Sequence, residues 1–81
     1  MISEYDQYDH NEANKAFESS RYKELEEIIS YAEPDNLSSK ELVQLIAFKA
    51  LVQQKLHKIY WSIEVARLAI LALRKADIGE R

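Results

Sequence analysis

Apolar residues recur along this chain at the three- and four-residue spacing of α-helices, in blocks separated by short polar segments. The longest block follows Ser38. Ser38 and Glu41 form an S-x-x-E capping box, while Leu37 and Leu42 occupy the N′ and N4 positions of a hydrophobic staple. Two separate signals therefore predict that a helix begins at Ser38.

The first half of this block is too apolar to bury only one helix face. Its apolar residues are Leu42, Val43, Leu45, Ile46, Ala47, Phe48, Ala50, Leu51 and Val52. Together they cover most of the circumference of a helix, which indicates contact on more than one side. The pattern predicts a partner for this surplus, either the rest of the domain or another protein.

Two shorter helices are expected upstream. Asp9 or Asn11 can cap a first helix that ends at about Ser19. A second helix is predicted from about residue 21 to residue 33, where apolar residues again recur at helical spacing. Pro34 should end it, because the residue before a proline is disfavoured in the α region.

Residues 40–75 can be read as one helix or as two. A 4-3-4-3-4-3 spacing links Val52, Leu56, Ile59, Ile63, Ala66, Ile70 and Leu73, and would suit one continuous coiled-coil stripe in a homo-oligomer. Such a helix would be about 54 Å long, too long for a small domain to cover. The polar segment 53–58 interrupts the apolar pattern. We therefore favour a turn near Lys55 to Lys58 that joins two antiparallel helices.

The predicted fold class is all-α, with two successive antiparallel helical hairpins. The first hairpin spans 11–34 and the second 38–76, within one domain covering 11–78. Residues 1–10 are expected to form a flexible acidic N-terminus. Gly79 stands where a glycine commonly ends a helix.

The composition is that of a small folded domain, and its charges are distributed unevenly along the chain. The 81 residues are 47% hydrophobic and 31% charged, which excludes a wholly disordered chain. Residues 1–36 hold ten acidic and three basic side chains, whereas residues 37–81 hold four and eight, so the halves carry about −7 and +4. Opposite signs should draw the halves together or present oppositely charged surfaces to partners. Cysteine is absent, which suits a cytoplasmic protein.

Catalytic and metal-binding interpretations have little support. Asp6 and His10 lie four residues apart, but one such pair is a weak metal signal, and His57 is expected in a turn. The sequence has no recognisable nucleophile setting and no glycine-rich phosphate loop. We predict no enzyme activity, no cofactor and no bound metal.

Membrane and nucleic-acid interpretations are also disfavoured. The apolar stretch Ile59–Leu73 is shorter than the roughly 20 residues that a membrane-spanning helix needs. A nucleic-acid interpretation would rest on Lys49, Lys55, Lys58, Arg67, Arg74 and Lys75. The pI of about 5.3 and the acidic first half argue against it.

The helical pattern also has an approximate repeat. Tyr22 and Ile59 begin the second helices of the two predicted hairpins and lie 37 residues apart, close to the tetratricopeptide period of about 34. Residues 45–57, read as LIAFKALVQQKLH and followed by residues 63–69, resemble the L-I-x-apolar-x-x-L-x-x-Q-G-x-Y turn of tetratricopeptide-like needle-subunit chaperones from bacterial type III secretion systems. Lys55 stands in place of the usual turn glycine, and residues 12–34 resemble the family's preceding hairpin more loosely.

This resemblance implies a cytoplasmic chaperone or its co-chaperone. Such a protein clasps the amphipathic C-terminal helix of the needle subunit in a concave apolar groove and prevents premature polymerisation. The candidate groove residues are Leu42, Leu45, Phe48, Leu51 and Val52, with Tyr60 and Trp61 as aromatic anchors at the edge. Without its partner the chain is expected to be marginally stable or to self-associate. The alternatives are an oligomerising helical adaptor and a small nucleic-acid-associated regulatory protein.

Overall fold

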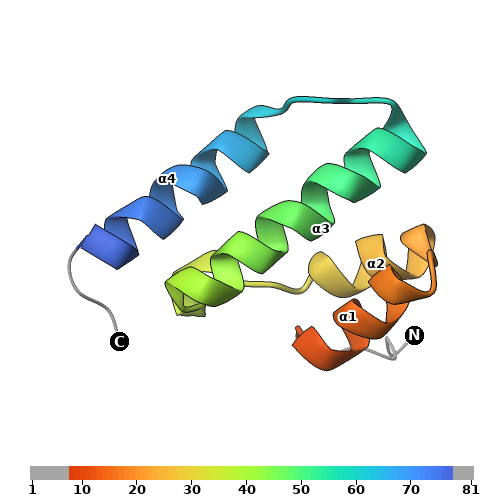
Figure 1. The fold of residues 1–81 in the computed structure, drawn as a ribbon, viewed down its shortest axis with the longest axis horizontal. Helices are drawn as coiled ribbons and strands as arrows, with labels where there is room; N and C mark the ends of the chain where they lie inside the picture. The colour runs from red at the N-terminus through yellow and green to blue at the C-terminus, as the bar shows by residue number, and fades with distance from the viewer. Residues whose placement is uncertain (1–7, 78–81) are drawn as a thin grey trace.

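The computed structural model describes residues 8–77, and its fold is all-α. The elements are α1 (His10–Glu18), α2 (Tyr22–Ile29), a short 3-10 helix η1 (Pro34–Asn36), α3 (Ser39–His57) and α4 (Ile63–Asp77). Figure 1 shows α3 in the middle, with α1 and α2 on one side and α4 antiparallel to it on the other. The predicted all-α class is confirmed, whereas the tetratricopeptide-like arrangement stays a prediction.

Side-chain caps fix the starts of α1 and α3. The carboxylate of Asp9 accepts hydrogen bonds from the backbone N–H groups of Asn11 at 3.0 Å and Glu12 at 3.2 Å. The Ser38 hydroxyl accepts from the Glu41 N–H at 3.2 Å, and the Glu41 carboxylate accepts from the Ser38 N–H at 2.9 Å. Both helix starts follow from the sequence, because these side chains replace the partners that the first N–H groups of a helix lack.

The hairpin turns are made without glycine. Ser20, after α1, and Lys58, after α3, adopt the left-handed conformation, each with φ of 59°. At the first turn the Arg21 N–H donates to the Ala16 carbonyl at 2.9 Å, as in a Schellman motif. At the second turn the Ile59 N–H donates to the Gln53 carbonyl at 3.0 Å. The left-handed residue reverses the chain at each position, at some conformational cost for a side chain with a Cβ atom.

Several predicted boundaries need correction. α2 ends at Ile29 rather than at residue 33, and Pro34 opens η1 instead of directly following α2. The second turn occupies residues 58–62, later than predicted, so His57 closes α3 and Ile59 lies in the turn. The single long helix is therefore not formed. Residues 1–7 of the expected acidic N-terminus, and Gly79, lie outside the described residues.

The core lies where α3 meets its neighbours. Its buried apolar residues are Ala13, Ala16, Leu25, Ile28, Ile29, Leu42, Leu45, Phe48, Val52, Leu68 and Ala72. α3 contacts α2 through one side and α4 through another, so the central helix supplies much of this interior. Among the described helices, none is long and apolar enough to cross a membrane.

Candidate partner-binding surface

Four residues of the predicted groove belong to the interior of the protein itself. Leu42, Leu45, Phe48 and Val52 expose at most 4% of their surface. The Phe48 ring packs against Phe17, with ring centroids 5.3 Å apart. These four side chains are nearly buried and belong to the core of the domain, so they do not form the exposed groove that the sequence predicts. The large side chains of α3 face the interior, where α2 and α4 pack against α3 and Phe17 of α1 contacts Phe48; their burial removes apolar area from water.

The other three predicted residues lie elsewhere. Leu51 is half-buried on α3, while Tyr60 and Trp61 lie in the turn after α3. These two aromatic side chains expose 79% and 71% of their surface. The structure therefore does not bring the seven predicted residues together into one groove.

The second hairpin does carry an apolar groove, but its lining includes none of the seven predicted residues. The groove has a volume of about 410 Å³ and lies between the first half of α3 and the second half of α4. We call it the outer groove; its lining residues are Ser39, Lys40, Val43, Ile46, Ala69, Ala72, Leu73 and Ala76. Val43 is 59% exposed and Leu73 is 70% exposed. Large apolar side chains thus stand in water on both helices that form the groove.

The exposed apolar surface continues along α4. Ile63 and Ile70 lie seven residues apart, on one face of the helix, and are 72% and 52% exposed. Leu73 follows Ile70 by three residues and joins this face to the outer groove. Only α3 makes extensive contact with α4, so most of the remaining circumference of α4 faces solvent. The apolar residues that the domain does not bury are therefore exposed along this face of α4.

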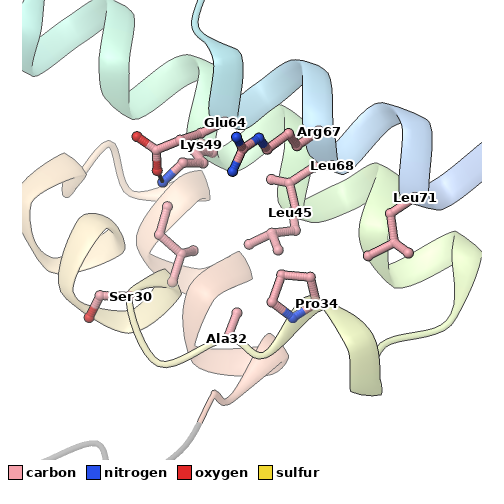
Figure 2. A pocket seen from close by; sticks show the side chains of 10 residues that line it. Ser30, Ala32, Pro34, Leu45, Lys49, Glu64, Arg67, Leu68 and Leu71 are labelled. Atoms are coloured by element: carbon pink, nitrogen blue, oxygen red, sulfur yellow. Dashed lines mark ion pairs between the residues drawn. The ribbon is translucent and has the colours of Figure 1, made fainter.

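A second hollow lies on the inner side of α4. Figure 2 shows this inner cavity, of about 340 Å³, between α4, α3 and the segment from Ala32 to Pro34. Leu45, Leu68 and Leu71 form part of its apolar wall. At its rim the ammonium of Lys49 lies 3.1 Å from the carboxylate of Glu64. The inner cavity thus combines an apolar wall with a charged rim, unlike the outer groove.

Titratable groups cluster near the start of α3 without forming a catalytic arrangement. The hydroxyl of Tyr8 lies 3.0 Å from Nδ1 of His10, whose ring packs against Phe48. Burial, with a smaller effect from the Glu41 carboxylate, raises the pKa of Tyr8 to about 12. Hydrogen bonds from Ser38 lower the pKa of Glu41. These groups are engaged with each other and with a helix cap.

Other candidate chemical groups are tied to structural contacts. Nε2 of His57 lies 2.6 Å from Oε2 of Glu26, which links the end of α3 to α2. Residues 8–77 contain no group of three or more potential metal ligands, and Asp6 lies outside this range. Of the basic residues considered for nucleic acid, Lys49 pairs with Glu64, and Lys75 donates to backbone carbonyls. The outer groove is therefore the most distinctive surface of the described chain.

Comparisons of the chain with protein-family models, curated proteins and solved structures find no match. The likeness to needle-subunit chaperones accordingly rests on the sequence, chiefly on residues 45–57 and 63–69 and more loosely on residues 12–34.

The sequence did not identify Val43, Ile70 and Leu73 as residues of a binding surface. The sequence shows more apolar residues on α3 than one face can hold, but the binding surface was predicted on the face that the domain itself buries. One signal was available: Val43 and Ala47 are smaller than Leu42, Leu45 and Phe48, and the larger side chains are normally buried first. For α4, the stripe through Ile63 and Ile70 was visible only as part of a possible coiled coil.

Proposed function

We propose that this chain is a non-enzymatic binding module that holds an amphipathic helix of another protein in the outer groove. The observation that carries the proposal is the exposure of Val43 and Leu73 on two adjacent helices, with a continuous alkyl lining between them. A partner helix would place anchors at i, i+3, i+4 and i+7 into such a groove. Binding would then bury apolar surface that the domain leaves in water.

The outer groove suits an apolar helix face better than the inner cavity does. Its lining contains six alkyl side chains, and its only charged member is Lys40. The inner cavity carries Lys49, Glu64 and Arg67 at its rim. An apolar anchor that entered there would have to desolvate the Lys49–Glu64 ion pair, which costs free energy.

We further propose that the partner is the needle subunit of a type III secretion system, bound by its C-terminal helix in the cytoplasm. The support is the resemblance of residues 45–57 to the turn of needle-subunit chaperones, together with the amphipathic character of the segment that such chaperones hold. Occupation of the outer groove would cover the apolar face through which needle subunits polymerise. A co-chaperone could share the exposed stripe of Ile63 and Ile70.

Co-expression with the needle subunit from the same bacterium tests this proposal. The expected result is a soluble heteromeric complex in size-exclusion chromatography with light scattering, and no needle polymer. The double variant Val43→Glu/Leu73→Glu should abolish the complex, whereas Lys23→Glu, an exposed change on α2, should leave it intact. If the wild type, the double variant and Lys23→Glu all form the same complex, the outer groove is not the binding site. If the chain instead forms only homo-oligomers that the double variant dissolves, the face serves self-assembly and the chaperone proposal fails.

A further inference from the structure

The turn between α3 and α4 exposes an unusual group of side chains. Tyr60 and Trp61 are 79% and 71% exposed, and they are flanked by Ile59 at 42% and Ile63 at 72%. The ring contacts of the described residues join Tyr8, His10, Phe17 and Phe48, so neither turn aromatic takes part. An aromatic group of this size, left in water, indicates a surface that is used for contact.

The position of the turn indicates which kind of partner it can contact. Figure 1 shows residues 58–62 as the tip of the second hairpin, at the far end of the molecule from the C-terminal end of α4. These residues do not line the outer groove. The five residues of this turn are too few to enclose a partner helix, but an exposed turn can enter a deformable medium such as the headgroup layer of a bilayer. Tyr and Trp concentrate in that layer, because one part of each ring system is apolar and another part is polar.

Two lysines precede the aromatic residues of this turn in the sequence. Lys55 and Lys58 are exposed, and no ion pair of the described residues includes them. The neighbouring carboxylates are already paired, since Glu26 lies 2.6 Å from His57 and Glu64 lies 3.1 Å from Lys49. The local surface therefore offers two free ammonium groups beside the aromatic pair, although the whole chain is acidic. Free ammonium groups next to an interfacial aromatic cluster complement anionic lipid headgroups.

We propose that the 58–62 turn docks on an anionic lipid surface. Tyr60 and Trp61 enter the headgroup region, while the long side chains of Lys55 and Lys58 reach lipid phosphates and carboxylates. Such docking is peripheral and requires no membrane-spanning helix. The residues differ from those of the outer groove, so this inference stands independently of the proposed function.

Trp61 is the only tryptophan of the chain, so its fluorescence reports on the tip alone. The full chain is titrated with vesicles of phosphatidylcholine and with vesicles that contain 30% phosphatidylserine. Entry into the headgroup region should shift the Trp61 emission maximum to shorter wavelength with the anionic vesicles, and brominated lipids should quench it. Because surface electrostatics are screened by salt, 0.5 M NaCl should reverse most of the shift.

A matched pair of variants tests the role of the two lysines. Lys55→Glu/Lys58→Glu should raise the lipid concentration for half-maximal binding at least tenfold. Lys23→Glu/Arg74→Glu changes the net charge identically at two exposed positions away from the tip and should bind nearly as the wild type does.

Several results would overturn the proposal. The first is an unshifted and unquenched Trp61 spectrum with anionic vesicles. The second is equal binding to both kinds of vesicle or equal losses in the two double variants. The third is a shift that appears without lipid as protein concentration rises, which would assign the tip to contact with a second copy of the chain.

Discussion

The ammonium of Lys75, near the end of α4, lies 2.8 Å from the backbone carbonyl oxygen of Asp35, forty residues earlier. The same ammonium also donates to the carbonyl groups of Pro34 and Leu37. One side chain thereby satisfies three carbonyl groups of the segment that joins the two hairpins. It also links the last turns of α4, which carry Leu73 and Ile70, to that segment.

Replacing Lys75 should loosen α4. Lys75→Met keeps an apolar side chain of similar length but loses the donors, so we expect a loss of about 1.5–3 kcal/mol in the free energy of unfolding, the range for hydrogen bonds to a charged group. Lys75→Arg should recover part of this loss, because guanidinium can also donate to several carbonyls. Urea denaturation followed by circular dichroism measures both values. Wild-type stability in Lys75→Met would show that these hydrogen bonds do not hold α4.

The capping box should make stability depend on pH in the acidic range. The pKa of Glu41 is lowered from 4.5 in the folded chain, so its carboxylate adds stability that is complete above this value and is lost as the pH falls through the folded pKa. Glu41→Gln keeps a hydrogen-bond acceptor but not the charge, and should be roughly 0.5–1 kcal/mol less stable at pH 7. This difference should shrink below pH 4.5. A gap between the two proteins that stays constant down to pH 3 would contradict the role of the Glu41 charge.

The left-handed turn residue after α1 offers a stabilising change. Ser20 has a φ of 59°, a conformation that glycine adopts without the steric cost of a Cβ atom. Ser20→Gly should therefore raise the free energy of unfolding by about 0.5–1 kcal/mol, less the extra flexibility of glycine in the unfolded chain. The control is Ser19→Gly, where φ is −92° and glycine should only destabilise. Equal effects of the two substitutions on the thermal midpoint would argue against a strained turn.

Two glutamate substitutions distinguish core from surface in the second hairpin. Phe48 is 4% exposed and Leu73 is 70% exposed. Phe48→Glu would bury an unpaired carboxylate and should abolish most helicity of the isolated chain, since such a charge costs several kcal/mol. Leu73→Glu should keep its helical circular dichroism. Full helicity in Phe48→Glu would contradict the packing of α3 against α1 and α2.

The sequence predicted the starts of α1 and α3 well because these depend on local hydrogen bonds, whereas α4 begins at Ile63 and not at the predicted Ile59. Asp9 and the Ser38–Glu41 capping box bond to residues within one helical turn, so their role can be predicted from the sequence. The turn between α3 and α4 was placed about three residues too early, because Lys58 is not a glycine that would mark the left-handed position. Which end of a polar segment reverses the chain depends on the tertiary packing of the helices that it joins.

The binding surface was less predictable, because it depends on which faces the domain covers by itself. On α3, Leu42 and Val43 are adjacent in sequence, yet one is fully buried and the other is 59% exposed. The helical period alone cannot rank two apolar faces of one helix. That ranking depends on tertiary packing: α2 packs against α3, and Phe17 of α1 contacts Phe48, on the face that carries the larger side chains.

The central claim is that the outer groove holds an amphipathic helix, and an isothermal titration with a peptide of the needle subunit's C-terminal helix tests it most directly. Leu73→Glu and Tyr60→Glu each place one carboxylate at a highly exposed position of the second hairpin, the first in the groove and the second at the tip. We predict that wild type and Tyr60→Glu bind with similar affinity, whereas Leu73→Glu binds at least tenfold more weakly. Equal affinity of Leu73→Glu and wild type, or no binding of the peptide by wild type, would contradict the claim.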